Sequence, residues 1–268
     1  KKLGLGVMLY ANGVGPVVGE LGAKLAREAL QDCDIISLRE ALSLEELGRL
    51  GVQNKNVYVT ADPAFMLAPC EDEWKKHLLA REGLEPGKEH VAFALRRSEG
   101  LAPDFEGEIE KACKSLRDRH GLVPVFIAMQ RPSDVGLARS LAAKSGGLCI
   151  SELTAPELIA LLSVCRFTVG MRLHSLIYSA VAGTPVIPLS YDVKVDALIE
   201  SINCASSEKG SIKPISVKSL TAEALITEAE RVIANRDAMA RQIASAAKAL
   251  AEQASESARL LADLMERL

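Results

Sequence analysis

The chain has 268 residues, of which 49% are hydrophobic and 25% are charged, and its net charge at pH 7 is −3. These proportions are ordinary for a globular protein with a sizeable core. The acidic balance and the 4% aromatic content argue against the basic surface and stacking platforms of a nucleic-acid-binding protein. No apolar run reaches the ~18 residues that a membrane-spanning helix needs.

Six cysteines are scattered along the chain without a Cys-x-x-Cys pair, and the four histidines are scattered as well. This pattern predicts reduced, mostly buried thiols and a cytoplasmic protein, rather than a disulfide framework. We also expect no metal site, because no local spacing brings several ligands together.

Short apolar runs alternate with amphipathic segments of helical period. The predicted strands are residues 7–11, 34–39, 57–62, 91–96, 123–130, 147–150, 167–170 and 185–190. The predicted helices are residues 19–31, 41–50, 71–83, 105–120, 133–145, 154–165, 173–182 and 193–202, followed by a helical tail from about residue 219. Continuous apolar strands separated by helices predict a parallel sheet covered on both faces.

The alternation breaks near residues 66–88 and then restarts. We therefore expect two Rossmann-like halves, residues 1–67 and 68–218, and C-terminal helices over 219–268 that pack back across them.

In a parallel sheet, ligands bind outside the carboxyl ends of the strands. The polar residues expected at these ends in the second half are Arg96, Gln130, Arg131, Arg172, His174, Tyr191, Asp192 and Lys194. Arg172 and His174 also stand at a helix start, where free N–H groups favour an anion. We predict a site for a small, doubly anionic substrate, with His174 available for acid–base chemistry.

Each of these residues taken alone is more often a solvated, capping or packed side chain. The hypothesis therefore depends on their shared position. In the first half the corresponding residues are Asn12, Gly13, Gly15, Arg39, Glu40 and Asp62. The NGVGP loop could let a ligand approach the backbone, but the chain has neither a dinucleotide-binding glycine fingerprint nor a P-loop. Asp62 is expected to cap or brace the loop that follows it.

One stretch carries a specific resemblance: GMRLHSLIYSAVAGTPVIPLSYDVKV, residues 170–195. With YANGVGP, DIISLRE, VTADPAF, FALR and VFIAMQRPSD in this order, it resembles the polysaccharide pyruvyl transferases over most of residues 5–205, and their bacterial cell-wall branch in particular. The resemblance implies an α/β, GT-B-like fold with two Rossmann-like parallel-sheet halves and a helical C-terminal tail. It also implies a further strand and a glycine-rich loop ahead of Lys1, so we expect the N-terminal half to be incomplete.

The resemblance implies transfer of the enolpyruvyl group of phosphoenolpyruvate to a sugar, forming a cyclic pyruvate ketal. In the cell-wall branch the acceptor is N-acetylmannosamine on a lipid-linked precursor of a secondary cell wall polymer, and the ketal later anchors S-layer proteins. Phosphoenolpyruvate is then the donor substrate, and no cofactor or metal is expected. A lipid-linked acceptor further implies peripheral association with the inner face of the plasma membrane.

The resemblance also implies roles for individual residues. Those expected to bind phosphoenolpyruvate are Arg96, Arg172, Leu173, His174 and Lys194, with His174 and Lys194 catalytic. From their position at the strand ends, we expect Asn12, Gly13, Arg39, Asp62, Gln130 and Tyr191 to line the cleft or the acceptor side.

Two alternatives remain open from the sequence. The first is a nucleotide-sugar glycosyltransferase of the same fold, for which Glu157 is a candidate ribose ligand. The second is a binding module without catalysis.

Overall fold

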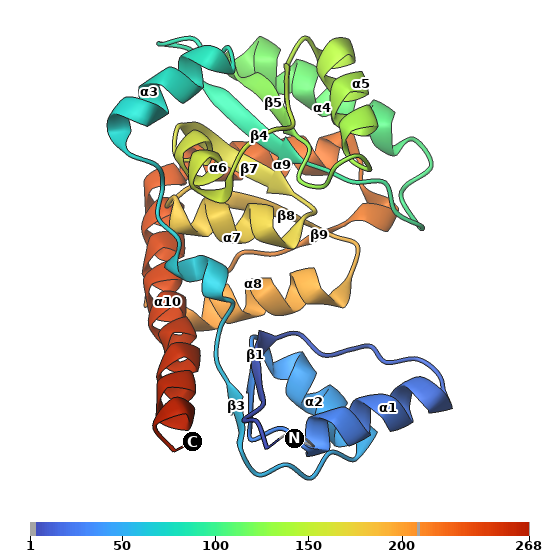
Figure 1. Cartoon of the computed structure of the whole chain (residues 1–268). Coiled ribbons are helices and arrows are strands. Elements are labelled where there is room, and N and C mark those ends of the chain that lie inside the picture. The colour runs from blue at the N-terminus through green and yellow to red at the C-terminus, as the bar shows by residue number, and fades with distance from the viewer. Residues whose placement is uncertain (1–3, 208–209, 268) are drawn as a thin grey trace. The chain divides into compact units, whose positions relative to one another are not determined.

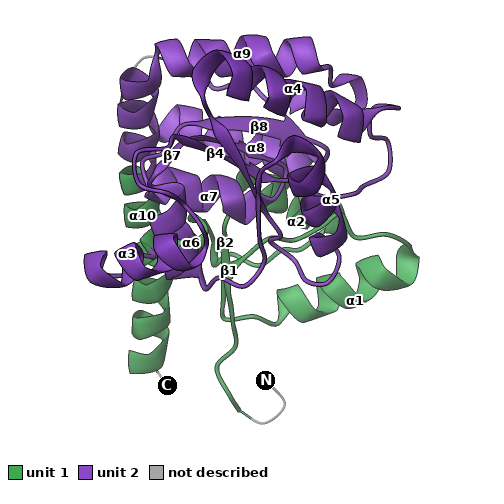
Figure 2. Ribbon diagram, turned by 90° about the horizontal axis from the view of Figure 1, so that it is seen from above, with its two compact units in different colours: residues 1–66, 248–268 green, residues 67–247 purple. Residues whose placement is uncertain are grey.

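A computed structural model describes residues 4–207 and 210–267. The predicted N-terminal half and the predicted C-terminal helices each extend beyond the described residues, by residues 1–3 and by residue 268. The chain forms two compact units, coloured separately in Figure 2. Unit 1 contains residues 1–66 and 248–268, and unit 2 contains residues 67–247.

Unit 1 is built on a small parallel sheet in the order β1-β2-β3. Its elements are β1 (Met8–Asn12), α1 (Glu20–Gln31), β2 (Ile35–Leu38), α2 (Ala41–Leu50), β3 (Val57–Val59) and a 3₁₀ helix at Pro63–Met66. Every residue of the central strand β2 is buried. Leu38 packs with Leu47 of α2 on one face, and Ile35 packs with Leu260 and Leu264 of the C-terminal helix on the other.

Unit 2 contains a larger sheet in the order β6-β5-β4-β7-β8-β9, in which every strand pair is parallel. Its first elements are α3 (Asp72–Arg81), β4 (His90–Ala94), α4 (Phe105–His120), β5 (Val123–Ile127), α5 (Val135–Ser145), β6 (Leu148–Ile150), α6 (Ala155–Leu162) and β7 (Cys165–Gly170). Those that follow are α7 (Leu173–Val181), β8 (Val186–Ser190), α8 (Val193–Ala205), β9 (Ile215–Ser216), a 3₁₀ helix at Val217–Ser219, α9 (Ala222–Ala234) and α10 (Arg236–Glu266), which begins in unit 2 and ends in unit 1.

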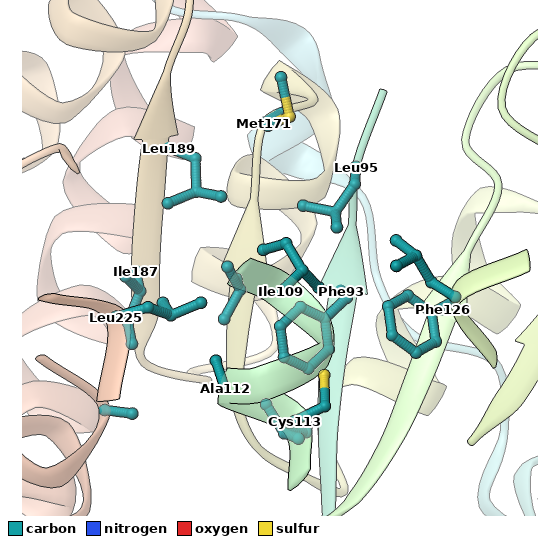
Figure 3. Packing of buried hydrophobic residues seen from close by; sticks show 14 of the residues in the cluster. Phe93, Leu95, Ile109, Ala112, Cys113, Phe126, Met171, Ile187, Leu189 and Leu225 are labelled. Atoms are coloured by element: carbon teal, nitrogen blue, oxygen red, sulfur yellow. The ribbon is translucent and has the colours of Figure 1, made fainter. Parts of the chain in front are cut away.

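The core of unit 2 lies on both faces of β4, whose side chains alternate between them. Phe93 joins the cluster beneath α4, α5 and α9 (Figures 1 and 3), while Ala92 joins the cluster on the side of α6. The rings of Phe93 and Phe126, from neighbouring strands, stack with centroids 5.1 Å apart. Burying a side chain of this size stabilises the fold by about 1.5–3 kcal/mol relative to its exposure. The core thereby fixes the strands that carry the site.

The α/β alternation and the parallel sheets confirm the predicted fold class. The Thr154–Glu157 capping box at the start of α6 is also present. Some predicted boundaries were wrong. The strand predicted over 123–130 ends at Ile127, and its last predicted residue, Gln130, instead begins a turn in which its carbonyl accepts the Asp134 N–H at 2.9 Å. The helix predicted to reach Cys165 ends at Leu162, and Cys165 begins β7. The two-residue strand β9 was not predicted.

By contacts, residues 219–247 group with unit 2 and residues 248–268 with unit 1. The three-part domain division stays a prediction. The expectation that most thiols are buried is wrong: Cys113 and Cys165 are buried, but Cys149 on the edge strand β6 and Cys204 near the end of α8 are exposed. Of the helices in the described part of the chain, none combines the length and apolar character needed to cross a lipid bilayer.

Candidate functional site

Four neighbouring strands of unit 2 bring the predicted residues to one edge of the sheet. Because β5, β4, β7 and β8 are adjacent and parallel, the segments that follow them leave from the same edge (Figure 1). We call the polar and flanking residues of these segments the unit 2 rim, which comprises Arg96, Gln130, Arg131, Arg172, Leu173, His174, Tyr191 and Lys194. The predicted common edge is therefore confirmed, and the partners of each side chain decide what it can do.

Arg96, which follows β4, is held by an uncharged partner. Its Nη1 donates to the Tyr191 hydroxyl at 3.1 Å, and its Cζ lies 4.9 Å from the centre of the Tyr191 ring. Its Nε donates to the Arg97 carbonyl at 3.3 Å. A cation stacked on an aromatic ring keeps its full charge while losing side-chain freedom. Arg96 is thus oriented but not neutralised, and Tyr191 orients it.

Arg172, which follows β7, is held by a buried carboxylate instead. Its Nε donates to Oδ2 of Asp134 at 2.9 Å, and its Nη2 donates to Oδ1 of the same residue. The side chains of Arg172 and Asp134 are 14% and 1% exposed. This bidentate pair neutralises most of the charge of Arg172 and leaves the Nη1 amino group as its remaining donor.

The start of α7 places Leu173 and His174 directly after Arg172. Gly170 allows this tight entry, because a Cβ at that position would lie 2.8 Å from Ser175 Oγ and 2.7 Å from the Leu176 side chain. Ser175 in turn donates its hydroxyl to the Arg172 carbonyl at 2.6 Å. Leu173 is half-buried, whereas His174 is exposed, and the His174 ring lies 5.8 Å from that of Tyr178. His174 is therefore the accessible acid–base group of the rim.

Lys194 lies in the first turn of α8. The side chain of Asp192 caps this helix by accepting the Lys194 N–H at 2.9 Å. Among the residues that the structure describes, the half-buried Lys194 ammonium has no hydrogen-bond or ion-pair partner. It therefore keeps its positive charge beside a helix N-terminus, where an anion is favoured.

A cavity of about 490 Å³ opens beside His174, between the ends of β5 and β6 and the starts of α6 and α7. Its walls are mixed: apolar residues such as Met129 and Leu153 lie beside polar ones, which include Ser151, Thr154, His174 and Tyr178. Arg131 also lines it but is paired with Glu152. The cavity thus combines apolar surface with several convergent polar groups, as small-molecule sites usually do.

Gln130 is exposed and enters the rim through its backbone, whose N–H donates to Asp134 Oδ2 at 3.0 Å. Glu157, the candidate ribose ligand, is 8% exposed. Its Oε2 accepts from the Thr154 N–H and hydroxyl, both at 2.8 Å, and its Oε1 accepts from Trp74 Nε1 at 3.2 Å. These bonds lower the pKa of Glu157, and the bonds from Thr154 have the largest effect. Glu157 caps the start of α6, and both of its carboxylate oxygens already accept hydrogen bonds.

The residues predicted in the first half meet within unit 1, at the ends of β1, β2 and β3. We call Asn12, Gly13, Arg39 and Asp62 the unit 1 rim. Arg39 Nη1 donates to Asp62 Oδ2 at 2.7 Å, and Arg39 Nε lies 3.4 Å from Glu40 Oε2. Asp62 also accepts the Ala64 N–H at 3.0 Å, which is the capping role that the sequence predicts. Arg39 is therefore enclosed by carboxylates.

Asn12 is exposed, and its carbonyl accepts the Arg39 N–H at 3.2 Å. A Cβ on Gly13 would lie 2.7 Å from Glu40 Oε1, so a glycine is needed for this loop to pass the ion pair. The four residues thus form one small network inside unit 1.

Three residues were missed from the sequence: Asp134, Glu152 and Tyr178. In the stretch RPSD, Asp134 has the pattern of a helix N-cap, and no local sequence signal indicates that it pairs with Arg172, 38 positions away. Tyr178 was a helical residue one turn beyond His174, and that spacing could have identified it. Within residues 4–207 and 210–267, no group of three or more His, Cys, Asp or Glu side chains is placed to hold a metal ion. That the protein needs no metal stays a prediction.

Solved structures similar to this chain share its fold. HepE of Anabaena, solved with UDP-glucose, gives a TM-score of 0.64 at 10% identity and covers 98% of this chain and 72% of HepE. MnaA of S. aureus, solved with UDP, gives 0.67 at 15% identity over 97% of this chain and 68% of MnaA. A glycosyltransferase of Rickettsia africae gives 0.65 at 11% identity over 96% and 70%. These likenesses show the GT-B fold.

Sequence comparison is more specific. The amylovoran biosynthesis protein AmsJ of Erwinia amylovora is 23% identical over 258 residues, which are 90% of this chain and 61% of AmsJ. The chain therefore spans less than two thirds of the length of this relative. Residues 1–193 match the sequence pattern shared by the polysaccharide pyruvyl transferase family. With this match over most of its length, the chain belongs to the polysaccharide pyruvyl transferase family, a family of transferases.

Proposed function

We propose that the protein transfers the pyruvyl group of phosphoenolpyruvate to a sugar of a polysaccharide precursor, forming a ketal. The family supports pyruvyl transfer as the reaction. The observation that carries the donor assignment is the set of cations at one sheet edge: Arg96 after β4, Arg172 after β7 and Lys194 at the start of α8.

Phosphoenolpyruvate has two anionic groups, a carboxylate and a phosphate. Arg96 and Lys194 have no carboxylate partner among the described residues and can each neutralise one of them. Arg172 contributes its Nη1 edge, and the free N–H groups at the start of α7 add a partial positive charge. Leu173 contributes a half-buried apolar contact beside them. The unit 2 rim thus has the charge and the groups that this donor requires.

The reaction balances without an oxidant or reductant. A sugar hydroxyl oxygen bonds to C2 of phosphoenolpyruvate, C3 takes up a proton to become a methyl group, and the hydroxyl proton is released. The C2–O bond to phosphate then breaks, a second hydroxyl of the same sugar bonds to C2 to close the ketal, and its proton goes to the departing phosphate. The products are the ketal and inorganic phosphate.

His174 is the group that we assign to proton transfer in this reaction. It is exposed at the rim and two residues from Arg172, and an imidazole can both give and take a proton near neutral pH. Arg96 and Lys194 stabilise the negative charge that builds on the departing phosphate, which is where preorganised cations contribute most. Lys194 is therefore catalytic together with His174 in this proposal.

For the acceptor we propose N-acetylmannosamine on a lipid-linked cell-wall precursor, which places the protein at the inner face of the plasma membrane. The resemblance of residues 170–195 to the cell-wall branch supports this choice. AmsJ is named for the biosynthesis of another bacterial polysaccharide, amylovoran, and its similarity supports a polysaccharide precursor in general.

Nucleotide-sugar glycosyl transfer is the second candidate function. The cavity beside His174 favours it, because its apolar wall residues could contact a base, and HepE and MnaA were solved with UDP-glucose and UDP. Against it, the carboxylate of Glu157 is committed to the start of α6. Arg131 is likewise paired with Glu152.

A turnover assay separates the two functions. The full chain is incubated with a synthetic N-acetylmannosaminyl acceptor and either phosphoenolpyruvate or a UDP-sugar, and inorganic phosphate, UDP and the product mass are measured. We expect phosphate release and a pyruvyl ketal with phosphoenolpyruvate. Release of UDP with a glycosylated product, and no ketal, would instead establish the alternative.

A further inference from the structure

Asp134 is the most deeply buried charged residue of the unit 2 rim network, and it holds four polar groups at once. Its side chain, 1% exposed, accepts from Nε and Nη2 of Arg172 and from the Gln130 N–H at 3.0 Å. The Ser133 hydroxyl lies 3.2 Å from its Oδ1. A buried carboxylate is costly unless it is paired in this way.

Asp134 stands at the N-cap of α5 without capping it. An aspartate there usually accepts an N–H of the first helical turn, which stabilises the helix by about 1 kcal/mol. In α5 no such side-chain bond is made. The carboxylate is directed to Arg172 instead, on the segment that follows another strand of the sheet. The Asp134 side chain therefore makes a long-range ion pair with Arg172 in place of the local helix cap that the sequence suggests.

This pair sets the direction of Arg172 and joins two segments of the rim. With Nε and Nη2 committed to Asp134, the Arg172 guanidinium has only Nη1 to offer an incoming anion. The same contact ties the turn at residues 130–134, after β5, to the start of α7, where His174 lies. A displacement of about 1 Å at a reacting centre can cost a hundredfold in rate, so this fastening matters to the chemistry.

We propose that Asp134 is a positioning residue of the phosphoenolpyruvate site. It aims Arg172 and fixes the start of α7, and it leaves Arg96 and Lys194 to supply the net positive charge. This inference rests on the proposed function, because it concerns the same donor. It predicts that the carboxylate acts on donor binding only through Arg172.

A double-mutant cycle tests this dependence. Phosphoenolpyruvate is titrated by calorimetry into the full-length wild type and into the Asp134→Ala, Arg172→Ala and doubly substituted chains, and thermal midpoints are recorded alongside. We expect Asp134→Ala to raise the Kd about tenfold in the wild-type background and less than about twofold when Arg172 is already alanine, since contacting residues are not additive.

Asp134→Asn covers the case in which the alanine variant does not fold. The amide keeps the shape but offers one acceptor oxygen and turns an NH₂ toward the guanidinium, so its Kd should also rise. Asp104→Asn is the matched control, because Asp104 stands at the N-cap of α4 with an exposed side chain, 69% accessible, that pairs with Lys111 rather than with a rim residue. Its Kd should equal that of the wild type.

The outcomes are distinguishable. A lower thermal midpoint with an unchanged Kd in both Asp134 variants would mean a purely structural brace and would overturn the inference alone. An equal Kd increase in both backgrounds would overturn it as well. Absence of phosphoenolpyruvate binding by the wild type would overturn the proposed function and the inference together.

Discussion

The two units each carry an arginine at the carboxyl end of a central parallel strand, but they treat its charge differently. In unit 1, Arg39 follows β2 and lies between Asp62 and Glu40, with all three side chains mostly buried. In unit 2, Arg96 follows β4 and is held by the uncharged Tyr191. The unit 1 rim therefore binds its own cation, whereas the unit 2 rim keeps a cation available.

This comparison shows that topological position alone does not identify an anion site. Both arginines satisfy the rule that ligands bind at strand ends. The partners decide the outcome, because a buried carboxylate satisfies an arginine that an aromatic ring would only orient. The same distinction applies within unit 2, where Arg172 is paired with Asp134 and Lys194 is not paired with a described residue.

Of the substitutions that test the difference between the two rims, replacement of His174 is expected to lower turnover the most. All four histidines of the chain belong to unit 2, and His174 is the one at its rim. His174→Ala should lower ketal-forming turnover by about 10²–10⁴-fold, as loss of a general acid–base group does, while phosphoenolpyruvate still binds. Phosphate-release kinetics and calorimetry check the two halves of this statement. Turnover near the wild-type rate would remove His174 from the mechanism.

Arg39 should affect stability rather than donor binding. Arg39→Ala leaves Asp62 and Glu40, with side chains 10% and 11% exposed, without their shared cation. Breaking such a buried pair costs about 3 kcal/mol, which corresponds to a lowering of the thermal midpoint by roughly 5–10 °C.

The matched control is Lys24→Ala, which breaks an exposed Lys24–Glu28 pair of unit 1 and should leave the midpoint nearly unchanged. A loss of midpoint no greater than in this control would show that the unit 1 rim is not held together by its arginine.

A smaller effect is expected from His90, which begins β4 at the opposite end from Arg96 and is 4% exposed. Burial lowers the pKa of His90 below its ordinary value. The unfolded chain then binds more protons than the folded chain between the two pKa values, so the free energy of unfolding falls as the pH drops below about 6.5.

Denaturant unfolding of the wild type and of His90→Gln between pH 5 and 8 measures this dependence. The substitution should flatten the profile in that window. An identical slope in both proteins would assign the pH dependence to other groups.

The sequence was sufficient for the features that depend on local pattern. Apolar runs and helical periods located strands β1 to β8, though not the short β9, and strand polarity brought Arg96, Arg172 and Lys194 to one edge. The capping box of Thr154 and Glu157 was likewise readable, because its members are three residues apart.

The pairing of side chains far apart in the sequence could not be predicted from such local patterns. The bonds of Arg172 to Asp134 and of Arg96 to Tyr191 join residues 38 and 95 positions apart, and only the folded sheet brings them together. The sequence therefore indicated which residues share an edge, but not which of their charges are already neutralised.

Calorimetric titration of phosphoenolpyruvate tests the central claim, that the unit 2 rim binds the donor through its uncompensated cations, most directly. The wild type should bind, and Arg96→Ala should raise the Kd about tenfold or more, as loss of a charged hydrogen bond does. Arg97→Ala, at the exposed neighbour paired with Glu106, and Arg39→Ala should both stay within about twofold of the wild type. Absence of binding by the wild type, or equal Kd values for the wild type and Arg96→Ala, would contradict this account.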